Sequence, residues 1–547
     1  MRDITVFRAR KFITMDPVRP AATHVAVRDG RILAVGGDEI WQGLGAARAD
    51  DRYADAVLMP GLVEAHSHLM EGALWKFVYA GYYDRRDPEG RLWTGLKSVD
   101  GIVERLAEME RTLADPDAPL LAWGFDPVYF GEQRMTVREL DAVSERRPIV
   151  LLHASFHLMN VNSAMLRKAG ITRQTDIEGI ARHADGEPNG ELQGFAAMFP
   201  VNRAIGNVMR TVGVTEEGVW RFARVAQRTG VTTATDLVNN LAEPGVRLLE
   251  DVTSREDYPL RIVPIYRGPQ ALATIEQDLG LAALAAARST DKLRFGAMKL
   301  TLDGSITGYT ARLRWPGYHN GKPNGIWIMS PTEVHGVVAR IHGAGVQLHI
   351  HTNGDEATGL ALDAIEAALE KHPRPDHRHT LHHCQTADAA QFRRMARLGV
   401  CANLFVNHIY YWGDVHYAQT LGPSRANRMN ACGTARLHGV PLAIHSDAPV
   451  TPIGPLFTAW CAAVRRTAGG RVLGEGERIT VADALHAVTL GAAYTLAMDG
   501  EIGSIEVGKR ADFCVLADDP LAVPVEDLKD VPVLGTMLGG RAFDAAQ

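Results

Sequence analysis

The sequence predicts an α/β protein: a (β/α)8 barrel of the TIM type with an inserted lid subdomain, plus a small β-sandwich domain formed by both chain ends. Short apolar strands alternate with helical segments through most of the 547 residues. Both ends of the chain instead carry strand-like alternation of apolar and polar residues. The distance along the chain between the first and second barrel strands is too long for one helix and its loops.

Residues 1–60 and 499–547 are predicted to form the composite β-sandwich domain. The segments ITVFRARKFITMD and HVAVRDGRILAVG near the start, and VPVLGTMLGGRAF near the end, alternate as half-buried strands do. Neither end alone has enough strands to bury one face of a sheet, so the two ends must meet in space.

Residues 61–498 are predicted to form the barrel, with PGLVEAHSH as its first strand. The other strands are VTTATDLV, LRIVPIYR, LRFGAMKLTLDG, VQLHIHTNGD, RHTLHHCQ, VCANLF and PLAIHSDAPV. Helical segments such as DEATGLALDAIEAALEKH stand between them. The insertion after the first strand covers about 71–229, and we expect it to form a lid over the mouth of the barrel.

The composition is that of an ordinary globular protein and gives no support to several other classes. A net charge of −6 gives no reason to expect nucleic acid or an anionic membrane as partner. No apolar run is long enough to span a bilayer, and no secretory signal is visible. The five cysteines are scattered and form neither a disulfide framework nor a CxxC pair. We therefore expect a cytoplasmic location, and the sequence leaves a homodimer open.

Polar side chains gather where the predicted strands end, which is the active-site end of such barrels. His66 and His68 are two residues apart on a strand, so both imidazoles share one face and can hold a metal ion. A pair of ordinary barrel-lining histidines is the alternative. His349 and His351 also share a face, and His351 is preferred as a ligand because it is nearer the strand's end. His349 is expected to pack in the core.

A lysine and an aspartate complete the candidate metal centre. Asp447 ends the eighth strand, where it can bind metal and accept a proton, or merely cap the next segment. Lys299 points inward from the fourth strand, which is costly for an unpaired ammonium. Carbamylation by CO2 would turn it into an anion bridging two cations, whereas an ion pair with Asp303 or Asp236 is the alternative.

These motifs resemble those of the amidohydrolase superfamily, within it the amidohydrolase-3 or YtcJ-like branch that includes N-substituted formamide deformylases. The resemblance is carried by MPGLVEAHSH, KLTLDGSITGYTA, HIHTNGDEA, LHHCQTAD, IHSDAPVTP and GSIEVGKRADFCVL. It implies a metal centre that includes Asp447 as catalytic residue, with the remaining ligands His66, His68, Lys299, His351 and His383. The HLMNVNSAML segment implies lid or substrate contacts by His157 and Asn162.

The sequence departs from that branch at two places. His382 stands where the branch usually has Glu, which leaves open whether His382 or His383 binds the metal. The strand-seven segment CANLFVNHIYYWGDVHY lacks the usual S-x-Q-P. Its polar and aromatic side chains form a candidate substrate pocket made of His408, Trp412, Asp414 and His416. An equal alternative is that the aromatic side chains only pack in the interior.

The resulting hypothesis is a metal-dependent hydrolase that attacks an amide, formamide or carbamate-like C–N bond. One or two divalent ions would activate the water, and Asp447 would act as general base. The nitrogen-rich ligands favour Zn2+, with iron, manganese or nickel left open. The same centre could catalyse ester or lactone hydrolysis, deamination, decarboxylation or retro-aldol cleavage. A metal-binding sensor or scaffold without catalysis is the alternative from another class.

Overall fold

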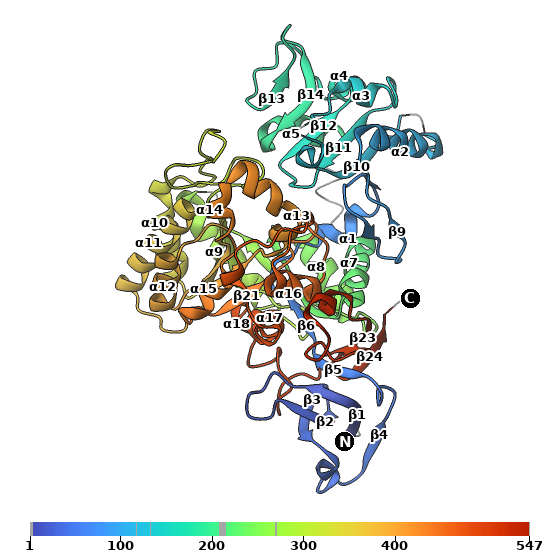
Figure 1. Cartoon of the computed structure of the whole chain (residues 1–547), viewed down its shortest axis with the longest axis vertical. Coiled ribbons are helices and arrows are strands. Elements are labelled where there is room, and N and C mark those ends of the chain that lie inside the picture. Colours follow the sequence, from blue (N-terminus) through green and yellow to red (C-terminus); the bar gives the residue numbers. More distant parts are fainter. Residues whose placement is uncertain (1–3, 116, 132, 207–214, 269–270, 546–547) are drawn as a thin grey trace. The chain divides into compact units, whose positions relative to one another are not determined.

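A computed structural model describes residues 4–115, 117–131, 133–206, 215–268 and 271–545. The chain divides into two compact units (Figure 1). The first unit consists of Met1–His68 and Ala223–Gln547, and the second is Leu69–Phe222. Helix α7 (Glu216–Arg228) contains the boundary between them. Among the described residues, no helix is both long enough and apolar enough to cross a membrane.

The first unit contains the predicted parallel barrel sheet, in which all eight predicted strands are confirmed. Neighbouring strands pair in the order in which they occur along the chain. A parallel bridge between Ser67 and Ala448 connects the end of the last strand to the end of the first. The strands are β6 (Leu62–Glu64), β15 (Val231–Asn239), β16 (Arg261–Arg267), β17 (Ala297–Thr301), β18 (Gln347–Thr352), β19 (Thr380–His383), β20 (Cys401–Leu404) and β21 (Leu442–Ile444).

Helices connect these strands, as the alternating pattern predicts. Helix α12 (Ala389–Leu398) illustrates the local causes: Asp388 and Gln391 form a capping box at its start, and Gly399 ends it at φ +71°. The other helices of this unit include α8 (Glu243–Ser254), α9 (Ile275–Ala286), α10 (Pro331–Gly343), α11 (Asp355–Lys371), α13 (Asn407–Val415), α14 (Gly422–Ala426), α15 (Cys432–Leu437), α16 (Pro455–Val464), α17 (Val481–Ala487) and α18 (Leu490–Thr495). One π-helical turn, η5 (His416–Thr420), follows α13.

Both chain ends contribute to a second sheet in the same unit, as predicted. Its order is β24-β23-β22-β5-β1-β2-β3, and β4 pairs with β1. Strand β5 joins the two ends, because it pairs with β1 on one side and with β22 on the other. The predicted boundaries at residues 60 and 499 stay predictions. The strands are β1 (Ile4–Ile13), β2 (Ala21–Arg28), β3 (Arg31–Gly36), β4 (Ala47–Asp50), β5 (Val57–Pro60), β22 (Phe513–Leu516), β23 (Val533–Leu538) and β24 (Arg541–Asp544).

The second unit has its own six-stranded sheet, in the order β13-β14-β12-β11-β10-β7. Buried apolar side chains such as Trp123, Leu152 and Met165 form its core. The predicted lid role and the predicted bounds of 71–229 stay predictions. The elements are α1 (Met70–Leu74), β7 (Val78–Tyr79), β8 (Arg85–Arg86), β9 (Leu92–Trp93), α2 (Val99–Thr112), β10 (Leu120–Phe125), α3 (Val137–Asp141), β11 (Ile149–His153), β12 (Leu158–Val161), α4 (Ser163–Ala169), β13 (Ile180–Arg182), β14 (Pro188–Gln193) and α5 (Gly194–Ala204).

Candidate metal centre

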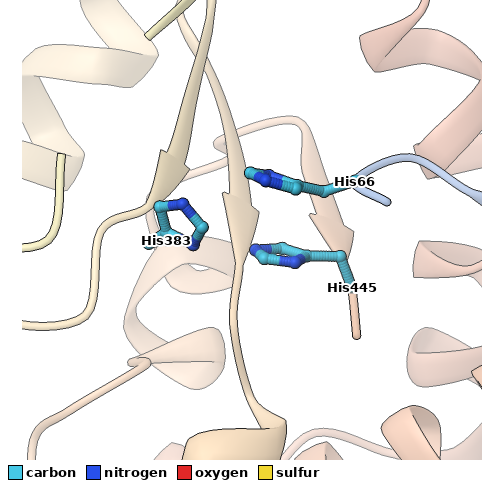
Figure 2. A group of neighbouring side chains, drawn as sticks. All are labelled: His66, His383 and His445. Carbon is cyan, nitrogen blue, oxygen red and sulfur yellow. The ribbon is translucent and has the colours of Figure 1, made fainter. Parts of the chain in front are cut away.

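Three histidines from different strands converge at the carboxyl end of the barrel sheet (Figure 2). His66 follows β6, His383 ends β19, and His445 follows β21. Each offers a ring nitrogen, and these nitrogens lie within 4.8 Å of one another. The rings of His66 and His445 stack with centroids 4.4 Å apart, and His383 faces them. This spacing suits three ligands of a single metal ion.

Asp447 forms a second group with His66 and His68, and the ligand atoms of these three residues also lie within 4.8 Å of one another. The Nε2 atoms of both histidines lie 3.2 Å from Oδ1 of Asp447. His383 Nδ1 lies 3.9 Å from Oδ2 of the same carboxylate. Asp447 therefore belongs to the second group and also lies near His383 of the first.

The backbone at Asp447 and His383 lies in the left-handed region, with φ of +55° and +69°. A side chain with a Cβ adopts this conformation at a cost of about 1 kcal/mol or more. Among the described residues, the structure shows His68 as the hydrogen-bond donor to the Asp447 carboxylate, and no backbone N–H is capped by it. The geometry thus favours the predicted site role of Asp447 over the capping role.

Burial and charge set the protonation states of these groups. Burial lowers the pKa of His66 and His383 well below the ordinary value, and that of His445 to about 3. Burial alone would raise the pKa of Asp447, but the hydrogen bond from His68 and the neighbouring imidazoles outweigh that effect, so the pKa of Asp447 is lowered. Neutral imidazoles around an ionised carboxylate are the forms that bind a metal cation.

Several buried nitrogens of the site are left without hydrogen-bond partners. Both ring nitrogens of His445, Nδ1 of His383 and Nζ of Lys299 have none among the described residues. Buried polar atoms are rarely unpaired, since leaving one costs about 1–3 kcal/mol. A metal ion would satisfy Nδ1 of His383 and one of the two ring nitrogens of His445, so the donor set fits such an ion.

A chain of three histidines extends from the ligand group into the barrel. Nδ1 of His66 lies 2.8 Å from Nδ1 of His382, and Nε2 of His382 lies 2.8 Å from Nδ1 of His349. If His66 binds metal through Nε2, its Nδ1–H donates to His382. Asn403 Nδ2, at 3.4 Å, donates to the same His382 nitrogen. His382 then donates from Nε2 to His349, and each ring has one fixed tautomer.

This arrangement bears on the question that the sequence left open. His383 belongs to the ligand group, whereas both nitrogens of His382 are used by neighbouring histidines. His382 therefore contacts the candidate ligand His66 and is not itself in a ligand group. His349 is fully buried, where the sequence placed it in the core.

Lys299 is buried, and the structure gives its ammonium group no ion pair among the described residues. Asp303, one proposed partner, instead accepts backbone N–H groups of Arg312, Asn353 and Gly354. Burial lowers the pKa of Lys299 to about 7. The ion-pair alternative with Asp303 is thus not observed.

His351 lies beside the ligand group without belonging to it. Its ring centroid is 4.4 Å from that of His383. Its Nε2 contacts Asn353 Nδ2 at 3.1 Å and the carbonyl oxygen of Gly304 at 3.3 Å. Its role as a ligand stays a prediction.

The strand-seven residues divide between the site and the surface. His408 is buried, its ring packs on Trp412 at 4.4 Å, and its Nδ1 lies 3.0 Å from Nε2 of His416. Asp414 is directed elsewhere: its side chain is 44% exposed, accepts Gly469 N–H and lies 3.6 Å from Arg471. The structure does not bring Asp414 together with the histidines.

The two predicted residues of the inserted unit have contacts within that unit. The Asn162 amide accepts N–H groups of Ile149 and Met165 and donates to the carbonyls of Ser144 and Arg147. It caps α4, and its four ordinary hydrogen bonds leave no capacity for a substrate. His157 packs against Phe195, with ring centroids 5.6 Å apart.

His445 is the ligand candidate that sequence reasoning missed. It stands two residues before Asp447, which is the same spacing as that of His66 and His68. That spacing places both side chains on one face of a strand and could have identified it.

Comparison with known proteins agrees with the expected resemblance. The sequence model of the amidohydrolase family matches residues 54–543. The putative amidohydrolase YtcJ of Bacillus subtilis is 28% identical over 94% of this chain and 95% of its own length. N-substituted formamide deformylase of Arthrobacter pascens is 27% identical, over 99% of this chain and 98% of its own. Among solved structures, an uncharacterized metal-dependent hydrolase from Pyrococcus horikoshii aligns with a TM-score of 0.73 at 19% identity, covering 96% of this chain and 99% of its own. At that identity the structural likeness shows the fold alone.

Proposed function

This chain belongs to the amidohydrolase family, and on that premise we propose that it is a metal-dependent hydrolase that cleaves a C–N bond of a small molecule. One observation carries the proposal: His66, His383 and His445 bring ring nitrogens together at the carboxyl end of the barrel, and the Asp447 carboxylate contacts His66 and His68 beside them. That end is where barrels of this type build active sites. The match to a formamide deformylase favours formamides and amides among the C–N substrates.

Two overlapping groups could each hold a metal ion: His66 with His383 and His445, and His66 with His68 and Asp447. A bound divalent ion supplies a Lewis acid and lowers the pKa of water. The two ligand groups share His66, whose single Nε2 lone pair serves one ion. A second ion therefore needs further ligands, for which Lys299 and His351 are the candidates.

Lys299 fits the role of a carboxylated bridge in chemical terms. Its pKa of about 7 leaves a large fraction of the amine neutral at physiological pH. A neutral Nζ can add to CO2 and lose one proton, which forms a carbamate with two acceptor oxygens. His349, its neighbour in register on β18, has an unpaired Nε2 that such an oxygen could accept from.

Asp447 is proposed to move the proton during hydrolysis. Its carboxylate is ionised at neutral pH, so it can accept a proton from the attacking water. The same group then returns that proton to the leaving nitrogen, which departs as a neutral amine. His68 holds Asp447 in position through Nε2 at 3.2 Å. The nitrogen-rich donor set favours Zn2+ as the ion.

The experiment is a metal analysis combined with a defined substrate panel. Purified protein is tested with formanilide, acetanilide, phenyl carbamate and phenyl acetate, before and after removal of metal by 1,10-phenanthroline. We expect bound zinc, release of aniline from an anilide, and loss of that activity on chelation with recovery on adding Zn2+. Hydrolysis of phenyl acetate alone would favour the ester alternative. Metal-loaded protein that hydrolyses none of the four would favour a sensor or scaffold.

A further inference from the structure

A second hydrogen-bonded chain, made of His408, His416 and Thr420, has no part in the ligand groups described above. Nδ1 of His408 lies 3.0 Å from Nε2 of His416, and Nδ1 of His416 lies 2.7 Å from Oγ1 of Thr420. All three side chains are buried. Buried hydrogen-bonded imidazoles have one defined tautomer, so the direction of this chain can be worked out.

The direction is set by the hydroxyl of Thr420. Among the described residues, His416 is the partner that the structure gives this hydroxyl. A buried hydroxyl hydrogen needs an acceptor, so Thr420 donates to Nδ1 of His416. His416 consequently carries its own hydrogen on Nε2 and donates it to Nδ1 of His408. His408 must then carry its hydrogen on Nε2, which has no hydrogen-bond partner among the described residues.

The position of His408 relates this free N–H to the candidate metal centre. Helix α13 begins just after β20, so its first turn stands at the carboxyl end of the barrel strands. The His408 ring packs edge-on against Phe405 at 4.5 Å, and Phe405 stacks on His445 at 4.8 Å. Burial lowers the pKa of His408 well below its ordinary value, so its ring is neutral. One aromatic ring therefore separates His408 from a candidate ligand.

We propose that His408 contacts the substrate and donates its Nε2–H to the oxygen of the scissile carbonyl group, while His416 and Thr420 are positioning residues. The inference rests on the proposed function, because it assumes a carbonyl substrate. As water adds to the carbonyl carbon, the oxygen gains negative charge and the hydrogen bond from His408 strengthens. His408 remains neutral and transfers no proton. Substrates must therefore present a carbonyl oxygen on the side of α13.

The tautomer can be tested without any turnover. Full-length, zinc-loaded protein with 15N-labelled histidine is compared by two-bond 1H–15N correlation with His408→Phe and His416→Phe, which assign the two rings. We expect both rings to carry hydrogen on Nε2, and the His416 signals to change in Thr420→Val. A His408 ring with its hydrogen on Nδ1 would overturn the proposal, whether or not the substrate panel is hydrolysed.

The kinetic test uses variants that leave the metal ligands intact. His408→Phe should lower kcat on the best panel substrate by about 100- to 1000-fold, which is the usual effect of removing a transition-state donor. KM should change by no more than a few fold, and bound zinc should not change. His408→Gln, which keeps an N–H donor, should recover part of the loss. Wild-type kcat in zinc-loaded His408→Phe would reject the donor role.

Two substitutions of Thr420 form a matched pair of variant and control. They test the proposal even if His408→Phe fails to fold. Thr420→Val removes the hydroxyl and keeps the shape, so kcat should fall about 10-fold or more through loss of the preferred tautomer. Thr420→Ser keeps the hydroxyl and should stay close to wild type. Equal rates in the two variants would remove the positioning role. Absence of turnover by wild-type protein would contradict the proposed function, and the tautomer measurement would still decide this inference.

Discussion

Two buried histidine clusters lie at opposite ends of strand β19, and they use their ring nitrogens in opposite ways. The upper cluster follows the strands at their carboxyl ends, and the lower cluster lies where β18 and β19 begin. The upper cluster is His66, His383 and His445, and the lower cluster is His342, His377 and His379. All six side chains are buried. Burial alone therefore does not distinguish a candidate ligand from a structural histidine.

In the lower cluster every ring nitrogen has a partner. His342 Nε2 donates to the carbonyl oxygen of His372 at 2.7 Å, and its Nδ1 accepts from Nε2 of His379 at 2.8 Å. His379 Nδ1 accepts the backbone N–H of Leu348. His377 is likewise bonded through both nitrogens. The hydrogen bonds of these rings join helix α10 to the starts of strands β18 and β19.

In the upper cluster, three ring nitrogens have no hydrogen-bond partner among the described residues. They are both nitrogens of His445 and Nδ1 of His383. Since an unpaired buried nitrogen is costly, its persistence indicates a missing partner such as a metal ion. Whether the ring nitrogens have hydrogen-bond partners therefore distinguishes a candidate metal ligand from a structural histidine.

The largest expected effect comes from removing an upper-cluster ring. His66→Ala and His445→Ala should each lose bound metal, and turnover should fall below detection, because metal and ligand geometry disappear together. Metal content by mass spectrometry and turnover on the panel measure both. The control is His379→Ala from the lower cluster, which should keep its metal. Full metal occupancy in His445→Ala would break the distinction between the clusters.

Next in size is the effect of Asp447→Asn, which separates metal binding from catalysis. Asn keeps the shape and one ligand oxygen but cannot accept the proton. We expect the variant to keep most of its metal while kcat falls by about two to four orders of magnitude. Paired metal and rate measurements give the answer. A nearly normal rate in metal-loaded Asp447→Asn would instead support the capping role of this residue.

A smaller effect is expected from His382→Phe, which keeps an aromatic ring but removes the acceptor for His66 Nδ1–H. Metal affinity should fall by about 10- to 100-fold, as it does when a supporting partner of a ligand is removed. Competition with a chromophoric zinc chelator measures this change. Unaltered affinity would show that His66 needs no support from His382.

The smallest functional effect should come from the lower cluster itself. His379→Ala leaves His342 Nδ1 and Leu348 N–H unpaired, so the free energy of unfolding should fall by about 1–3 kcal/mol or more. Metal stoichiometry and kcat should stay near wild type. Urea unfolding, followed alongside metal analysis, tests both statements. If His379→Ala lost its metal but kept its stability, the lower cluster would be a metal site and not a structural one.

Much of the fold could be predicted because it rests on short-range patterns. The eight barrel strands follow from apolar runs between helical segments, and the HxH spacing places His66 and His68 on one face. The hydrogen bonds between His382 and its neighbours could not be predicted, because they depend on the side-chain orientations that β18 and β19 impose in register. The contact between Asp414, on helix α13, and Arg471 could not be predicted either, because Arg471 lies in a loop whose conformation has no local signal.

The bridge between Ser67 and Ala448 has a consequence for biosynthesis. Ribosomes add about 5–20 residues per second, so His66 leaves the ribosome roughly 20–80 s before Asp447, about 380 residues later. During that interval β6 lacks its last neighbour, and His66 and His68 are made before the other three candidate ligands. Strand β5 is separated from β6 by one residue. It also lacks its pairing partner β22 until the far end of the chain has been made. A metal ion held by the complete ligand set would therefore bind only after Asp447 has been made.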